Sequence, residues 1–202
     1  MVLINESMNK KEQIWREILQ KAIVDRRFEF TQMALAEKLN VSLSTVFNAL
    51  KVPRAQGAVK VTGRDFSLVD IEKLLYIFAT QRNLEKEIIY QTNVLAGAKE
   101  IEGLMPAGAV FTAYSAYGQK YGDAPADYAK VYVYAGACAL DEIKKRFPKQ
   151  KGESNLFVLK TDRLLESYGA IAPEAQIFCD LWNLKDWYAK DFLSALKIKI
   201  IR

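Results

Sequence analysis

The chain has 202 residues, of which 50% are hydrophobic, and this is enough for one large or two small domains with a real core. It contains no histidine, which excludes Ser-His and Cys-His nucleophile pairs and imidazole metal sites. The net charge of +5 is too small to indicate a nucleic-acid partner by itself.

Compartment signals in the sequence favour the cytoplasm. No apolar run approaches the roughly 20 residues of a membrane-spanning helix. The N-terminal stretch MVLINESMNKKEQ lacks the basic-then-apolar order of a signal peptide. Cys138 and Cys179 each lie in an apolar stretch without CxxC spacing, which predicts buried thiols outside any disulfide. We therefore expect a cytoplasmic protein that does not enter a membrane.

Charged residues are distributed unevenly along the chain. Residues 1–82 carry 13 bases and 9 acids, a net charge of +4, whereas residues 83–202 carry 16 bases and 15 acids, a net charge of +1. No carboxylate occurs between Glu37 and Asp65. The bases in this acid-free window are Lys38, Lys51, Arg54, Lys60 and Arg64. The window favours contact with an anionic partner.

In chain order, the first predicted elements are three helices. Apolar residues at helical spacing predict a helix over 10–25, and a short second helix, QMALAEKL, follows Thr31 as its cap. Asn40 suits a tight turn, because asparagine tolerates the left-handed conformation. The third helix then begins after Ser42 as its cap and runs from about 43 to 52. We expect Pro53 to end it, because proline disfavours helical geometry in the residue before it.

A hairpin and a fourth helix are predicted next. The stretch GAVKVTGRDFSLV indicates two short strands around a Thr-Gly-Arg-Asp turn. Asp70 is then expected to cap a longer helix, DIEKLLYIFATQR. The order helix, helix, turn, helix, hairpin, helix is the layout of a winged helix-turn-helix, which we assign to residues 1–84.

The remaining residues, 85–202, alternate strands with helices. Strands are predicted at AVFTAY, KVYVYA and NLFVLKT, while EKEIIYQT suits either a strand or a helix extension. Helices are predicted over NVLAGAKEIEGLM, near SAYGQKYG, and over ALDEIKKRF, DRLLESYG, EAQIFCDLWNL after Pro173, and DWYAKDFLSALK. This alternation predicts a small α/β domain with a mixed sheet, so that the whole chain is of the α+β class.

The third predicted helix is the candidate DNA-reading element. Six small or apolar residues occupy the positions at which two helices of such a motif cross: Ala36, Leu39, Val41, Val46, Ala49 and Leu50. They leave Ser44, Asn48 and Lys51 on the outer face, with Thr45 beside them. These side chains suit a major groove about 12 Å wide, since asparagine bonds the adenine edge, hydroxyls bond bases or phosphates, and lysine bonds phosphate or guanine.

Three further bases suit phosphate contacts on either side of that helix, and arginine at the hairpin tip suits a narrow minor groove. The predicted DNA-binding residues are Ser42, Ser44, Thr45, Asn48, Lys51, Arg54, Lys60 and Arg64. Two other interpretations stay open: a merely solvated polar face, and a protein-binding surface that Phe47 would suit if it is exposed.

Residues 10–82 resemble bacterial or archaeal winged-helix transcription regulators through the stretch LAEKLNVSLSTVFNAL. From about residue 93 on, VFTAYSAYGQKYG, KVYVYA, NLFVLKTDRLL and APEAQIFCDLW are similar to AbiEi-type regulators, the antitoxin halves of type IV toxin-antitoxin pairs. The TGxxAL string and the histidine often found in such proteins are absent. The resemblance implies a DNA-binding head on an α/β body, autorepression of an operon and a cognate toxin. We also expect a homodimer, because symmetric operators contain two half-sites.

An enzyme is the competing class, since the body distantly resembles nucleotidyltransferases, for which the winged helix would be a substrate grip. Their Gly-Ser loop and paired Asp-x-Asp magnesium site are both missing here. Asp123 and Asp127 stand in a stretch typical of a surface loop. We therefore predict no catalytic residue, no cofactor and no metal ligand.

Two further groups have both a structural and a functional interpretation. Asp180 interrupts the apolar run QIFCDLW, so we expect a buried carboxylate whose partner is Lys160, Arg163 or a backbone amide. Its role is then a salt bridge or cap, or else part of a ligand or partner site. Tyrosines 114, 117, 121, 128, 132 and 134 are expected to form aromatic core packing, with an effector pocket as the alternative.

Overall fold

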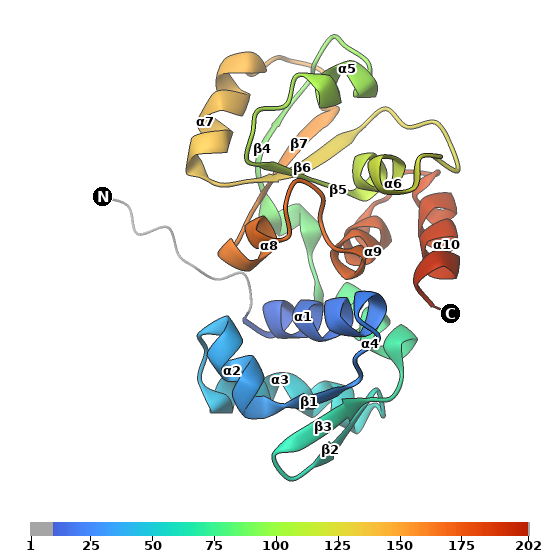
Figure 1. Cartoon of the computed structure of the whole chain (residues 1–202). Helices are drawn as coiled ribbons and strands as arrows, with labels where there is room; N and C mark the ends of the chain where they lie inside the picture. Colours follow the sequence, from blue (N-terminus) through green and yellow to red (C-terminus); the bar gives the residue numbers. More distant parts are fainter. Residues whose placement is uncertain (1–9, 202) are drawn as a thin grey trace. The chain divides into compact units, whose positions relative to one another are not determined.

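The computed structural model of the chain describes residues 10–201 (Figure 1). Most of the N-terminal stretch that was compared with a signal peptide lies outside the described residues. Within residues 10–201 the fold is α+β, with ten α-helices, one 3-10 helix and seven strands in two sheets. Contacts divide the chain into a head unit, Met1–Arg82 with Ile200–Arg202, and a body unit, Asn83–Lys199.

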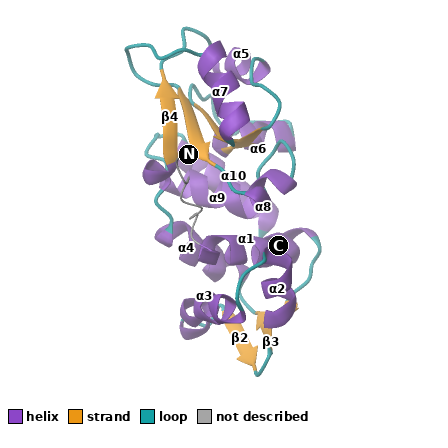
Figure 2. Ribbon diagram, turned by 90° about the vertical axis from the view of Figure 1, so that its left-hand side faces the viewer, coloured by secondary structure: helices purple, strands orange, loops and turns teal. Residues whose placement is uncertain are grey.

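The head unit combines four helices with a three-stranded antiparallel sheet of order β1-β3-β2. The elements are α1 (Lys10–Val24), β1 (Glu29–Thr31), α2 (Gln32–Leu39), α3 (Leu43–Ala55), β2 (Val59–Thr62), β3 (Asp65–Leu68) and α4 (Ile71–Gln81). The β2–β3 hairpin projects from the helices of this unit, as Figure 2 shows.

The predicted helix caps are confirmed. Thr31 Oγ1 accepts a hydrogen bond from the amide of Ala34 (3.1 Å), and Asp70 Oδ1 accepts one from Lys73 (2.8 Å). Asn40 has the left-handed backbone expected of it, with φ 49° and ψ 50°. These short-range signals therefore fix where α2 and α4 begin and where α2 ends.

Strand β1 is an element that the sequence did not predict. It is only three residues long, too short to display alternation. Its central Phe30 is buried and lies opposite Phe66 of β3, with the two rings stacked at 5.3 Å between centroids. The strand is therefore specified by this distant aromatic pair and not by its own sequence.

The predicted hairpin is present, with Thr62 opposite Asp65 and a two-residue loop between them. Gly63 occupies the first loop position with a φ of 66°. A positive φ at that position is what a type II′ turn requires, and glycine adopts it without strain. Arg64 is consequently held at the tip of the hairpin.

The predicted end of the third helix is wrong, because α3 continues through Pro53 to Ala55. Proline has no amide hydrogen for the carbonyl of the residue four positions earlier, which is Ala49. The indole N–H of Trp15, in α1, donates to that carbonyl instead (2.9 Å). A side chain from another helix thus satisfies the carbonyl that proline leaves without its helical donor.

The body unit contains the predicted mixed sheet, of order β4-β7-β6-β5. Strands β6 and β7 are parallel, and the two outer pairs are antiparallel. Its elements are the 3-10 helix η1 (Leu84–Glu87), β4 (Ile88–Thr92), α5 (Ala98–Gly103), β5 (Ala109–Thr112), α6 (Ala113–Tyr121), β6 (Val131–Ala135), α7 (Ala137–Arg146), β7 (Leu156–Lys160), α8 (Arg163–Ser167), α9 (Glu174–Asn183) and α10 (Ala189–Ile200).

The two faces of this sheet bury different kinds of side chain. On β6, Val131 and Val133 belong to an aliphatic core that includes Ile101 of α5 and Ile143 of α7. The intervening tyrosines of β6 point to the opposite face, where α6 packs. All five residues of β6 are buried, as expected for a strand covered on both sides.

Both edges of the body sheet are irregular. In β4 the register with β7 shifts between Ile88 and Tyr90, which leaves Ile89 exposed. At the other edge, Phe111 of β5 exchanges backbone hydrogen bonds with the segment around Ile171, accepting from Ala172 (2.9 Å) and donating to Ala170 (2.8 Å).

The prediction that both thiols are buried is wrong for Cys138, which is exposed, and confirmed for Cys179. In α7 the inward face is set by Ala139 and Ile143, four residues apart, so Cys138 points away from it. None of the helices in residues 10–201 is long and apolar enough to cross a membrane.

We expect Trp15→Phe to lower the free energy of unfolding by about 1–3 kcal/mol, because it leaves the buried carbonyl of Ala49 without a donor. In a Pro53→Ala background the loss is smaller, since an alanine at that position supplies the amide hydrogen itself. Urea unfolding of the wild type, both single variants and the double variant measures the coupling. Additivity within about 0.5 kcal/mol would contradict this account.

Candidate nucleic-acid interface

Helix α3 presents the predicted polar side chains to solvent. Ser44, Asn48 and Lys51 are exposed, whereas Val46 and Ala49 are fully buried. Thr45 is half-buried beside them. The helical spacing of the buried residues therefore determines the direction of the polar ones, as the sequence predicted.

The turn that joins α2 to α3 is held by backbone hydrogen bonds. The amide of Val41 donates to the carbonyl of Ala36 (3.0 Å), and the amide of Asn40 donates to Glu37 (3.2 Å). Helix α3 also packs against α1 and α2. Leu39 and Val41 are only half-buried at this joint. The orientation of α3 is therefore fixed from two sides, with its outer face left uncovered within the head unit.

A group of hydroxyls lies at the N-terminus of α3. Ser42 Oγ accepts from the amide of Thr45 (3.1 Å) and is within 2.9 Å of Ser44 Oγ and 2.7 Å of Thr45 Oγ1. The hydroxyl of Ser42 is therefore committed to capping the helix. Ser44 is exposed, does not cap the helix and has a hydroxyl oxygen with remaining acceptor capacity.

The cations of the head unit differ in whether a carboxylate neutralises them. Three lysines and one arginine pair with carboxylates, namely Lys21 with Asp25 (2.6 Å), Lys38 with Glu17, Lys73 with Asp70 (3.6 Å) and Arg82 with Glu12 (2.8 Å). A second set is exposed and forms no ion pair within residues 10–201: Lys51, Arg54, Lys60 and Arg64. These four bases of α3 and the β2–β3 hairpin are called the unpaired cation set. Lys10, Arg26 and Arg27 are also exposed without an ion pair within residues 10–201, but they lie at the start of α1 and in the link between α1 and β1.

Lys38 differs from the other bases of the acid-free window. It pairs with the buried Glu17 of α1, which is 21 residues away in sequence. Counting the bases of the acid-free window therefore gives one unpaired positive charge too many. The ion pair with Glu17 neutralises Lys38, and nothing in the local sequence around Lys38 indicates that pair.

Two apolar side chains lie on the same outer face: Phe47, which was named only for the alternative protein-binding surface, and Leu43, which was not predicted as part of a site. Leu43 is 51% exposed and Phe47 is 49% exposed. Lys51 Nζ lies 5.4 Å from the centroid of the Phe47 ring, a cation–π contact. Leu43, Phe47 and Lys51 follow one another at intervals of four residues and therefore lie along one side of the helix. The sequence reveals this row once the buried face of the helix has been identified.

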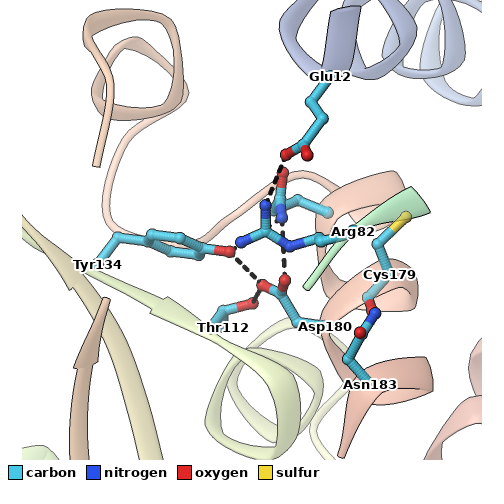
Figure 3. Close-up of polar contacts among 8 residues, drawn as sticks. Glu12, Arg82, Thr112, Tyr134, Cys179, Asp180 and Asn183 are labelled. Atoms are coloured by element: carbon cyan, nitrogen blue, oxygen red, sulfur yellow. Dashed lines mark hydrogen bonds and ion pairs between the residues drawn. The ribbon is translucent and has the colours of Figure 1, made fainter. Parts of the chain in front are cut away.

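Asp180 of the body unit is fully buried, as predicted, and side chains that were not predicted donate to it. The hydroxyls of Thr112 and Tyr134 each donate to Oδ2 at 2.6 Å (Figure 3). Gln176 Nε2 donates to Oδ1 at 3.0 Å. Hydrogen bonds to a buried carboxylate satisfy its acceptor sites. These bonds tie β5 and β6 to α9 and are structural.

Tyr114 and the two loop aspartates, the other candidate groups considered in the body, have very different surroundings. Tyr114 is fully buried against the rings of Tyr188 (4.8 Å) and Phe192 (4.9 Å), and burial raises the pKa of its hydroxyl. Asp123 and Asp127 lie exposed in the loop between α6 and β6. No group of three or more acidic or thiol side chains in residues 10–201 is placed to hold a metal ion.

Comparison with known protein families, with curated proteins and with solved structures finds no significant match to this chain.

We expect Ser42→Ala to lower the free energy of unfolding by about 1 kcal/mol, because the amide of Thr45 loses its acceptor. Ser42→Asp keeps a cap acceptor and should retain the stability. Ser44→Ala removes the neighbouring hydroxyl without removing the cap, so its effect should stay within about 0.5 kcal/mol. Thermal unfolding followed by circular dichroism compares the three, and equal losses in Ser42→Ala and Ser44→Ala would refute the capping assignment.

Proposed function

We propose that the chain is a sequence-specific DNA-binding transcription regulator whose head unit acts as a winged helix-turn-helix. The observation that carries this proposal is the unpaired cation set on α3 and the hairpin. Four exposed cations gathered on two adjacent elements are suited to a polyanion, since phosphates replace their counterions and the release of those ions drives binding.

In this proposal α3 enters the major groove and its outer face reads the bases. Asn48 is exposed near the middle of the helix and can bond both atoms of an adenine edge. Ser44 and Thr45 lie one turn earlier, where hydroxyls can reach bases or phosphates. Phe47 and Leu43 are exposed beside them, and apolar side chains contact the methyl group of thymine.

The flanking cations would hold the phosphate backbone. Arg54 lies in the last turn of α3, Lys60 on β2 and Arg64 at the tip of the hairpin. The tight two-residue loop gives Arg64 little freedom of position, which suits insertion into a narrow minor groove. Contacts on both sides of a recognition helix fix its register on the duplex.

We further propose that the protein binds as a homodimer, because one α3 covers a single half-site. The body unit would then bind a regulatory or protein partner. The resemblance of the body segments to AbiEi-type regulators is the basis for proposing an autorepressing antitoxin with a cognate toxin. Co-purification with the product of a neighbouring gene tests that partner.

A protein-binding use of the same face is the second candidate, and the exposure of Leu43 and Phe47 favours it. The two functions differ in salt dependence. DNA binding weakens steeply with salt because counterions are released, whereas an apolar interface centred on Phe47 does not.

The double change Lys51→Ala plus Arg64→Ala should weaken binding to duplexes selected from a random library. The slope of log K against log salt should fall by about 2, one for each cation removed from the DNA interface. The matched control, Lys21→Ala plus Lys73→Ala, removes two lysines that already have carboxylate partners, and its affinity and slope should not change. Unaltered affinity and slope in the first variant would rule out the proposed surface.

Asn48→Ala should reduce the ratio of specific to non-specific affinity by about 10-fold or more, which corresponds to loss of one bidentate base contact. Affinity for an unrelated duplex should be unchanged, since a base contact contributes nothing there. Fluorescence anisotropy with both duplexes measures the ratio. An equal loss on both duplexes would assign Asn48 to the backbone instead.

A further inference from the structure

The body unit has an open pocket of about 740 Å³ that the proposed DNA-binding surface does not use. Strands β4 and β7 border it on one side, and the segment between α9 and α10 borders it on the other. Half of its lining side chains are apolar or aromatic, and they include Leu84, Ile88, Ile89, Tyr132, Phe157 and Leu184. The volume lies within the range of about 300–1,000 Å³ that is typical of small-molecule sites.

The floor of the pocket follows from the strand register. Gln91 of β4 lies opposite Phe157 of β7, which lies opposite Tyr132 of β6, and that residue lies opposite Thr112 of β5. Residues in register on neighbouring strands point to the same face of a sheet. The row therefore runs across one face, and the rings of Tyr132 and Phe157 stack in it at 4.6 Å and 9°.

Helices cover only one end of this row. Helices α6 and α9 pack on the β5 side, and Thr112 there is fully buried with its hydroxyl on Asp180. At the other end Gln91 is exposed and Phe157 is half-exposed. The partly exposed ring of Phe157 thus forms an apolar floor, backed by Tyr132, at the end of the row that the helices leave uncovered.

The charged side chains around the pocket differ in whether a carboxylate neutralises them. Lys130 pairs with Asp186 (2.7 Å), a contact that raises the pKa of Lys130, and Lys185 pairs with Glu85 (3.6 Å). Lys149 forms no ion pair within residues 10–201. Its ammonium group donates to the carbonyl of Gln91 and lies 5.6 Å from the ring of Tyr90, both of which are uncharged. One positive charge therefore remains available at the edge of the aromatic floor.

We infer that this pocket binds a small aromatic anion, with its ring against Phe157 and its anionic group at the ammonium of Lys149. An aromatic face next to an unneutralised cation matches a planar ligand with one carboxylate. Neutral ligands would leave that cation without a counter-charge. This site does not depend on DNA binding, because all of its residues belong to the body unit.

The test uses calorimetric titration of the full chain with 2-naphthoate and with 2-naphthamide, which has the same rings but no charge. We expect naphthoate to bind at least about 10-fold more tightly, a difference of about 1.4 kcal/mol. Lys149→Gln should abolish that difference by weakening only naphthoate. Lys151→Gln makes the same charge change two residues away, outside the pocket lining, and should retain it.

Phe157→Leu keeps an apolar side chain but removes the ring, and it should weaken both ligands by a similar factor. Lys149 is an exposed side chain, so Lys149→Gln should fold normally. The comparison of naphthoate with naphthamide in that variant therefore remains valid even if Phe157→Leu is destabilised. Equal affinity for the two ligands would overturn the inference, as would an undiminished preference for naphthoate in Lys149→Gln. Absence of naphthoate binding at millimolar concentration would also overturn it.

Discussion

The hydrogen bond from the indole of Trp15 to the carbonyl of Ala49 is the contact on which the form of the head unit depends. Trp15 is almost completely buried and also meets Phe78 of α4 edge-on, at 6.2 Å between ring centroids. One side chain thus links α1 to both α3 and α4. It also satisfies the carbonyl that Pro53 leaves open, so α3 extends by one further turn. Arg54 consequently lies on a helix and not in a loop, which defines its direction relative to Lys51.

The features of the head that were predictable are those encoded within four or five residues. Thr31, Ser42 and Asp70 cap the amide three positions later, and Gly63 suits a two-residue turn. The features that were missed are set by partners far away in sequence. Strand β1 depends on Phe66, and the extension through Pro53 depends on a residue 34 positions away from Ala49. No local pattern encodes such contacts.

The distinction between locally encoded features and features set by distant residues also holds for the body unit, for the outer face of α3 and for the body pocket. Strands β5, β6 and β7 were predictable from their composition, and so was the burial of Asp180, whereas β4 was left open between a strand and a helix extension. The donors to that carboxylate were not, since Thr112 is 68 residues away from it. The floor of the pocket arises because Gln91, Phe157 and Tyr132 share one row, which requires strand order and register. By contrast, the outer face of α3 was accessible from sequence, because helical periodicity alone orients Asn48.

The irregular edges of the body sheet have a consequence for unwanted pairing between the edge strands of different chains. A regular edge strand exposes a row of amides and carbonyls that can template pairing with another chain. In β4 the register shift at Ile88 and the ammonium of Lys149 on the Gln91 carbonyl interrupt that row. In β5 the backbone of Phe111 is already occupied by the segment around Ile171. Both ends of the sheet are thus blunted, which protects a strand-rich unit from edge-to-edge aggregation during folding and at high concentration.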